Sequence, residues 1–256
     1  MKTTIDKINQ NLKSKFFFNF DTSKSVWFGA GGKVMVFCLV YDEKELEIIL
    51  NNIKEIPYEI IGAGSNLLVR DGGFNGIIFK LGKNFNNIIV NEKFINVGSG
   101  MLDVNLAKYA RINNIKNFEF YSGIPGSIGG AIKMNAGCYG SETKDILEEI
   151  KILNSKGEVR YLNKNEINFQ YRNSNLKNGD IIISAKFNLS HGDKDEINEK
   201  TNYIKTMRIN SQPIKSKTGG STFKNPKNNY AAKLIEMSDC KGMNVGDAYV
   251  SDKHSN

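Results

Sequence analysis

The segment GIPGSIGG, residues 123–130, places four glycines and one proline in eight consecutive positions. Glycine lets the backbone approach a ligand closely because it has no side chain, and successive backbone N–H groups at a bend form a concave site for an anion. Proline fixes one bend in this otherwise adaptable segment, so the loop has a defined shape. One glycine pair could simply permit close helix packing, but such packing does not explain the whole cluster.

A second glycine-rich loop, GAGSN, occupies residues 62–66. A dinucleotide-binding fingerprint would need a third glycine three residues further on and a helix that begins at once. Leu67 stands at that position instead, and the sequence has no Gly-Lys-Ser/Thr of a P-loop. A tight turn between strands is the structural alternative. Two anion-holding loops in one domain suggest a ligand with a diphosphate and two ends to hold.

The composition is that of a folded, water-soluble protein. Its 256 residues suffice for one large domain or two ordinary ones, with 40% hydrophobic and 24% charged residues. The longest apolar run, Val34–Tyr41, is far too short to span a bilayer. The net charge of +8 arises from lysines interleaved with acidic residues, which favours small anionic ligands and leaves a nucleic-acid surface unsupported. We expect a monomer that binds neither nucleic acid nor membranes.

The cysteine pattern indicates a reducing compartment. Cys38, Cys138 and Cys240 show neither paired nor metal-ligand spacing. We therefore expect a cytoplasmic protein with no disulfide and no metal site.

Helix and strand patterns alternate along the chain. The periodicity predicts helices over residues 45–56, 101–113, 197–208 and 230–240, and strands over 59–61, 67–69, 77–79, 149–153, 159–162 and 181–189. Asp42 and Glu45 are spaced as a capping box for the first helix. Leu102 is expected on the buried face of the second helix. The polar stretch 190–195 is typical of a domain boundary.

Two further motifs carry groups suited to chemistry. In GGSTFKNP, residues 219–226, two glycines leave Ser221 open to a ligand. No histidine is spaced to activate this hydroxyl as a nucleophile, whereas donating a proton to a basic carbanion needs no such partner. An ST-turn or an N-cap before Tyr230 is the structural alternative. In FQYRNS, residues 169–174, Arg172 could clamp a carboxylate or phosphate, or lie in a solvated ion pair.

Taken in this order, the segments resemble the UDP-N-acetylenolpyruvoylglucosamine reductase family, flavoenzymes of peptidoglycan precursor synthesis. The resemblance runs from about residue 21 to the C-terminus and includes three of the four prolines. Besides the glycine loops, the matching motifs are Trp27-Phe28 with Gly31-Gly32 (the family's first strand), Asn135-Ala136-Gly137, Tyr171-Arg172-Asn173-Ser174, Arg208 with Gln212-Pro213, Gly220-Ser221 with Phe223-Lys224-Asn225-Pro226, and Val250-Ser251 with Lys253-His254. Each motif is modest alone, but their shared order is specific.

The resemblance implies an α+β protein with an FAD-binding fold of the vanillyl-alcohol-oxidase type. That domain would cover residues 1–192, in lobes of about 1–82 and 83–192, and an incomplete substrate-binding domain would cover 193–256. The implied reaction reduces the enolpyruvyl group of UDP-N-acetylglucosamine enolpyruvate to give UDP-N-acetylmuramate, with FAD as cofactor and NADPH as co-substrate. Hydride would pass from NADPH to flavin N5 and then to C3 of the enolpyruvyl group.

The resemblance also implies residue roles. Arg172 matches the arginine that stabilises the enolate, and Ser221 matches the serine that protonates C2. The residues expected to hold FAD are Gly62, Ala63, Gly64, Ser65, Asn66, Ser122, Gly123, Ile124, Pro125, Gly126, Gly129, Gly130, Ala136 and Gly137. The residues expected to contact the UDP-sugar substrate are Tyr171, Gln212, Lys224 and Asn225.

The sequence departs from the family pattern in three places. The family continues past Lys253-His254 and supplies a catalytic glutamate there, so we expect a C-terminally truncated chain, with a non-catalytic or impaired flavin- or UDP-sugar-binding remnant as the alternative. Gly29-Ala30 replaces an arginine and a bulkier residue, and no long insertion follows Ser174, which indicates the short-loop subgroup. A different oxidase on the same fold is disfavoured, because many of those attach flavin through a histidine and neither His191 nor His254 adjoins a loop.

Overall fold

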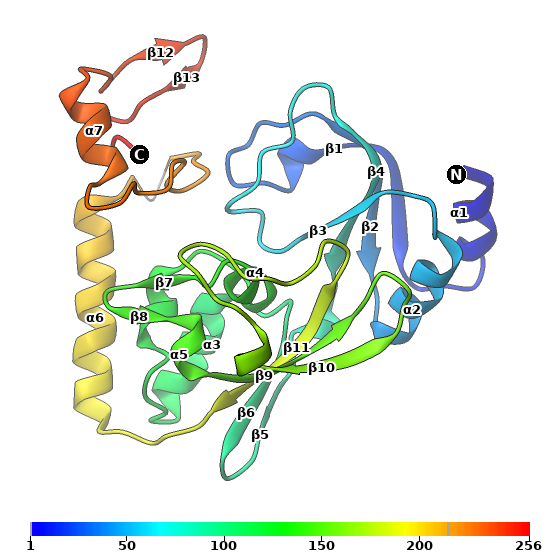
Figure 1. The fold of residues 1–256 in the computed structure, drawn as a ribbon, viewed down its shortest axis with the longest axis horizontal. Coiled ribbons are helices and arrows are strands. Elements are labelled where there is room, and N and C mark those ends of the chain that lie inside the picture. The colour runs from blue at the N-terminus through cyan, green and yellow to red at the C-terminus, as the bar shows by residue number, and fades with distance from the viewer. Residues whose placement is uncertain (1, 214–215) are drawn as a thin grey trace.

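The computed structural model describes residues 2–213 and 216–256 (Figure 1). The helices are α1 (Lys2–Asn9), α2 (Glu43–Asn52), α3 (Asp103–Ile112), α4 (Ile128–Lys133), α5 (Thr143–Ile146), α6 (Lys194–Ser211) and α7 (Ala231–Met237), with 3-10 turns η1 (Thr22–Lys24), η2 (Lys83–Phe85), η3 (Glu119–Gly123) and η4 (Lys164–Glu166). The strands are β1 (Lys15–Asp21), β2 (Lys33–Val40), β3 (Tyr58–Ile61), β4 (Phe74–Leu81), β5 (Ile88–Val90), β6 (Phe94–Gly98), β7 (Gly137–Cys138), β8 (Ser141–Glu142), β9 (Leu147–Leu153), β10 (Val159–Asn163), β11 (Ile181–Asn188), β12 (Asn244–Val245) and β13 (Ala248–Tyr249).

The first sheet has the order β1-β2-β4-β3. Strands β2, β4 and β3 run parallel, so the chain must cross over between β2 and β3, and it does so through α2. The N-terminus of α2 is capped by Asp42, whose Oδ1 accepts the backbone N–H of Glu45 at 2.9 Å. Only this half of the predicted capping box is present. The other half is wrong, because the Glu45 carboxylate accepts from Lys13 and Ser14 rather than from the Asp42 backbone.

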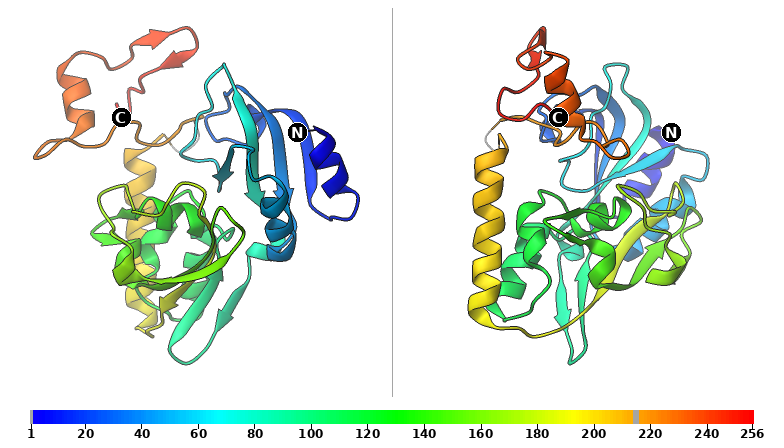
Figure 2. Two further views of the ribbon diagram at one scale, coloured as in Figure 1. Left: turned by 45° about the vertical axis from the view of Figure 1, so that its right-hand side comes forward. Right: turned by 60° about the vertical axis from the view of Figure 1, so that its left-hand side comes forward.

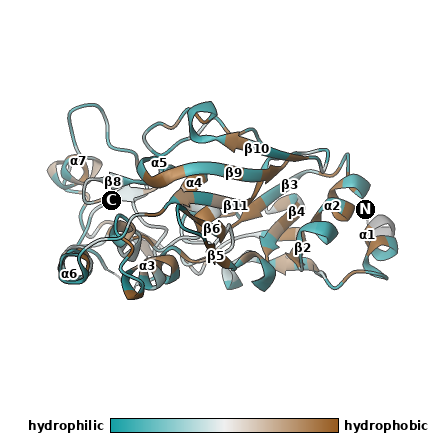
Figure 3. Ribbon diagram, turned by 90° about the horizontal axis from the view of Figure 1, so that it is seen from below, coloured by the Kyte–Doolittle hydropathy of each residue, from teal (hydrophilic) through white to brown (hydrophobic). Residues whose placement is uncertain are grey.

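The second sheet is antiparallel, with the order β10-β9-β11-β6-β5. Strand β11 joins the two halves because its side chains alternate between faces. Ile181 and Ile183 pack with α2 and the first sheet, whereas Ile182 packs in the core beneath α3 and α4. Figure 2 shows how closely the two sheets approach, and Figure 3 shows hydrophobic residues concentrated in these strands.

Three local predictions are wrong. Residues 67–69 form no strand, because the backbone carbonyls of Val69 and Arg70 accept from Gly32 and Gly73 in a loop. Trp27-Phe28 lies in a turn before β2 rather than in a strand. Leu102 precedes α3 and is 41% exposed, because the helix begins only at Asp103. The other predicted helices and strands are present with shifted ends, and α1 was not predicted.

A long helix separates the last part of the chain from the two sheets. Helix α6 has 18 residues and packs against η3, and its buried residues are Ile197, Thr201 and Ile204. Beyond it, α7 and the β12–β13 hairpin form a small unit beside the end of α6 (Figure 1). Among described residues from 216 onward, only Ala231 and Ser255 are buried. No helix in the described part of the chain combines the length and apolar character needed to cross a membrane.

Candidate active site

The two glycine loops lie against each other. A side chain at Gly62 would collide with the hydroxyl of Ser127, which lies within the second loop and is the N-cap residue of α4. The main chain of the second loop is fixed from below, because Ile128 and Gly129 donate their N–H groups to the carbonyls of Met101 and Ser99. The two bends therefore border one common region of the molecule.

The first loop offers a run of unused backbone donors. Within the described residues, the backbone N–H groups of Ala63, Gly64, Ser65 and Asn66 donate no hydrogen bond. Gly64 has a positive φ of 74°, and its carbonyl accepts from Trp27 at 2.9 Å, which fixes the bend. Consecutive free amides at a fixed bend fit the diphosphate of a bound FAD. The residues present thus fit the cofactor that this fold implies.

The glycines of the second loop also meet packing constraints. A Cβ on Gly126 would lie 2.5 Å from Oδ2 of Asp103, and one on Gly129 would lie 3.2 Å from Cβ of Ser99. A Cβ on Gly137, in the β7–β8 hairpin, would lie 2.5 Å from the backbone carbonyl oxygen of Ser141. Close packing therefore explains part of the glycine density. The cofactor-binding roles of all the predicted residues stay predictions, those of Ile124, Pro125, Gly130 and Ala136 included. The hydroxyl of Ser122, another of them, donates to the carbonyl of Glu119.

Arg172 is held at the tip of a tight turn. The backbone groups of Gln170 and Asn173 exchange two hydrogen bonds, of 3.0 and 3.2 Å, around Tyr171 and Arg172. Arg172 has a φ of 50°, a left-handed conformation that side-chain-bearing residues seldom adopt. Asn135 donates to the Gln170 carbonyl at 3.4 Å and so ties this turn to the segment after the second glycine loop.

The structure brings the two predicted catalytic residues together. Nη1 of Arg172 donates to the carbonyls of Ser221 and Phe223 at 3.1 and 3.2 Å. The Ser221 hydroxyl has no hydrogen-bond partner among the described residues and is free to meet a ligand. Gly220, with a φ of 75°, lies against the first loop, since a Cβ there would be 4.0 Å from the carbonyl of Ser65. The segment that carries Ser221 therefore comes near the first glycine loop at Gly220.

The predicted substrate contacts fall into two groups. Tyr171 and Asn225 are neighbours: the tyrosine hydroxyl accepts from the Asn225 backbone at 3.4 Å, and both line a shallow hollow of about 530 Å³. Asn225 also has a structural role, because its Oδ1 accepts from Ala231 at the start of α7. Lys224 is exposed beside them. Gln212 lies apart, on Arg208.

Arg208 links α6 to the second glycine loop. Its Nη1 donates to the Gly123 carbonyl at 2.9 Å, and its Nε donates to Oε1 of Gln212 at 3.2 Å. Burial lowers the pKa of this guanidinium, which nevertheless stays charged at neutral pH. The adjacent Cys138 thiol has its pKa raised to about 11 by burial, so it is a neutral packing group.

Several residues of this region were missed by the sequence interpretation. Ser127 stands between predicted glycines, but the glycine pattern gave it no role. Asp103 lies fully buried beneath Gly126 with neither carboxylate oxygen hydrogen-bonded among the described residues, and burial raises its pKa well above the usual range. Lys217 fills the space over Gly29, where a Cβ would lie 2.8 Å from its Cδ. Only the fold reveals these contacts. No cluster of three potential metal ligands occurs among the described residues.

Two family models and several named relatives match the chain. The family model of the FAD binding domain matches residues 34–163, and that of the UDP-N-acetylenolpyruvoylglucosamine reductase C-terminal domain matches residues 212–256. The reductases of that name from Rickettsia conorii and Rickettsia typhi are 40% and 41% identical, with 96% of this chain and 83% of each relative aligned.

Solved structures give the same result. The UDP-N-acetylenolpyruvylglucosamine reductase of Thermus caldophilus superposes with a TM-score of 0.85 at 31% identity, covering 96% of this chain and 87% of that one. A 6-hydroxy-D-nicotine oxidase from Arthrobacter nicotinovorans shares the fold alone, with a TM-score of 0.53 at 14% identity over 71% of this chain and 43% of that one.

The architecture and the comparisons thus define an α+β flavoprotein with the FAD-binding fold of vanillyl-alcohol-oxidase type. Within that class, the sequence identity of the relatives and the share of the chain that they cover show the family. The chain belongs to the UDP-N-acetylenolpyruvoylglucosamine reductase family.

Proposed function

We propose that this protein is an NADPH-dependent reductase that converts the enolpyruvyl ether of UDP-N-acetylglucosamine to the lactyl ether of UDP-N-acetylmuramate. The observation that carries the proposal is the contact of Arg172 with the backbone of Ser221. The segment of Ser221 also comes near the first glycine loop at Gly220, and in that loop the amides of residues 63–66 donate no hydrogen bond among the described residues. We propose residues 1–192 as the FAD-binding domain and residues 193–256 as the part that contacts substrate. We further propose that the protein acts as a monomer in the cytoplasm.

FAD, Arg172 and Ser221 have separate roles in the proposed reaction. When bound, FAD supplies hydride transfer between NADPH and C3 of the enolpyruvyl group. Negative charge then develops at C2 and spreads into the adjacent carboxylate. Nη1 of Arg172 is engaged by two carbonyls, and its remaining guanidinium donors can stabilise that charge as it grows. The unpaired Ser221 hydroxyl donates the proton to C2.

The test begins with the purified protein and FAD. Binding should quench flavin fluorescence, and NADPH oxidation should depend on the enolpyruvyl UDP-sugar. A control reaction with UDP-N-acetylglucosamine, which lacks the enolpyruvyl group, should show only the slow background rate. A protein that cannot be loaded with FAD would refute the proposal. Flavin binding and reduction without substrate-dependent turnover would instead indicate a flavin-binding protein that has lost the second half-reaction.

A further inference from the structure

The side chain of Asn256 binds both backbone polar groups of one residue, Phe223. The backbone N–H of Phe223 donates to Oδ1 of Asn256 at 2.7 Å, and Nδ2 of Asn256 donates back to the Phe223 carbonyl at 3.0 Å. An amide side chain carries a donor and an acceptor side by side, as this exchange requires. The phenyl ring of Phe223 is 59% exposed, so side-chain packing does little to fix this residue.

The carbonyl that Asn256 holds is also a partner of Arg172. Nη1 of Arg172 donates to the Phe223 carbonyl at 3.2 Å and to the Ser221 carbonyl at 3.1 Å. The orientation of the guanidinium therefore depends on two carbonyls of one exposed segment. Asn256 is the only side chain outside the Arg172 turn that bonds to the backbone of residues 221–223 in the described part of the chain.

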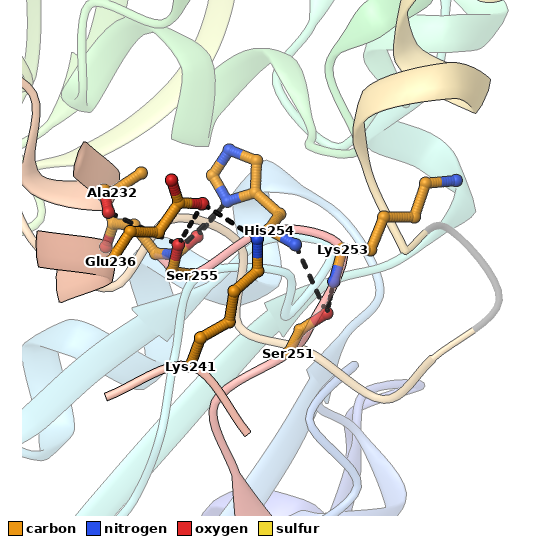
Figure 4. A network of polar contacts seen from close by, with 8 residues as sticks. Ala232, Glu236, Lys241, Ser251, Lys253, His254 and Ser255 are labelled. Atoms are coloured by element: carbon orange, nitrogen blue, oxygen red, sulfur yellow. Dashed lines mark hydrogen bonds and ion pairs between the residues drawn. The ribbon is translucent and has the colours of Figure 1, made fainter. Parts of the chain in front are cut away.

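Asn256 is in turn anchored to two helices. Its neighbour Ser255 is buried, and the Ser255 hydroxyl donates to Glu236 of α7 at 2.8 Å. Lys253 donates through Nζ to the carbonyl of Ile209 in α6 at 2.7 Å. Figure 4 shows Ser255 directed at Glu236, with His254 and Lys253 beside it. The segment 251–256 thus transmits the position of α6 and α7 to the Phe223 backbone.

We propose that Asn256 is a positioning residue for the proton-transfer half of the reaction. Its two hydrogen bonds to Phe223 hold the carbonyl that orients Arg172. They also fix the backbone segment that carries the Ser221 hydroxyl. Arg172 is then placed to stabilise the negative charge of the enolate while Ser221 protonates its C2. This inference rests on the proposed function. It assigns Asn256 no contact with substrate or cofactor.

The kinetic test compares Asn256→Ala with Asn244→Ala, a control asparagine on the β12–β13 hairpin of the same unit. Flavin reduction by NADPH should stay within two-fold of wild type in both variants. Reoxidation by the enolpyruvyl substrate should slow roughly ten-fold or more in Asn256→Ala alone, since small misplacements of catalytic groups carry costs of this size. In an Arg172→Lys background, Asn256→Ala should add less than two-fold, because both changes disturb one arrangement.

Other results would overturn the inference. Equal slowing of both half-reactions, or unaltered reoxidation, would show that Asn256 has at most a general structural role. A second measurement separates this inference from the proposed function. The guanidinium N–H signal of Arg172 in nuclear magnetic resonance should be distinct in wild type and averaged in Asn256→Ala. If wild type lacks turnover, the proposed function fails while that spectrum still decides whether Asn256 positions Arg172; an unchanged signal would refute it.

Discussion

Ser221 combines an unpaired hydroxyl with a backbone that other residues hold in place. The Ser221 carbonyl is bound by Arg172, whereas the hydroxyl faces no partner among the described residues. A side chain in that state is available for proton donation without a cost in lost hydrogen bonds. The hydroxyl of Ser221 is thus available for chemistry, whereas its backbone carbonyl has a structural role.

Replacing Ser221 by Ala should therefore slow only the second half-reaction. We expect reoxidation of reduced flavin by the enolpyruvyl substrate to fall about 10²-fold or more, the usual contribution of a general acid. Reduction by NADPH should be unchanged. Rapid-mixing absorbance measurements resolve the two steps. Thr222→Ala, which removes the neighbouring exposed hydroxyl, is the control. Loss of flavin reduction in Ser221→Ala would contradict the assigned role.

Both the backbone conformation and the close packing at position 64 favour glycine. Its φ of 74° disfavours any side chain, and a Cβ would strike the carbonyl of Ser25. Gly64→Ala should cost about 1–2 kcal/mol from the backbone conformation alone and weaken FAD binding. Thermal unfolding and flavin fluorescence titration measure the two effects. Gly72→Ala is the matched control, because a Cβ there meets nothing within 4 Å. Equal behaviour of the two variants would show that the loop tolerates reshaping.

At the scale of elements, α3 begins with an acid that the fold buries under the second glycine loop. Burial raises the pKa of Asp103 well above its usual range, so the native state keeps this proton at pH values where the unfolded chain, with a carboxyl pKa of about 3.9, releases it. The contribution of this group to stability is therefore complete below that pH. It is lost as the pH rises toward the native pKa.

Asp103→Asn removes this dependence, because the amide does not titrate. The variant should equal wild type in urea midpoint near pH 4 and exceed it at neutral pH. Urea unfolding of the apoprotein at both pH values checks the sign. A variant that is less stable at neutral pH would mean that the native carboxylate is ionised and has a compensating partner.

Elements with strong periodicity could be predicted from the sequence, and contacts between distant loops could not. Buried runs such as residues 77–79 and 181–188 are strands as predicted, because a short apolar run rich in β-branched residues is a local signal. Residues 67–69 are equally apolar but form a loop, in which the Val69 carbonyl accepts from the N–H of Gly32. The catalytic pair was inferred from motif order, whereas the Arg172–Ser221 contact and the clamp by Asn256 depend on tertiary structure.

At the scale of the whole molecule, stability is unevenly distributed. The two sheets share extended hydrophobic cores, whereas the part from residue 216 onward has two buried residues among those described. FAD at 100 times its Kd should stabilise the sheets by about 2.7 kcal/mol, since only the native state binds it. Hydrogen exchange should show β9 and β11 slowing on FAD addition, while α7 and the β12–β13 hairpin exchange fast with or without FAD. Uniform protection across the chain would contradict this division.

The approach of Gly220 to the Ser65 carbonyl has a consequence for how the protein acquires its native state. These residues come from the first and last thirds of the chain, so their meeting requires closure of a very long loop. Such closure is entropically slow and follows the local hairpins and helices. The approach of the Ser221 segment to the first glycine loop is thus among the last contacts to form during refolding, and a chain can hold most of its secondary structure before its proposed site is assembled.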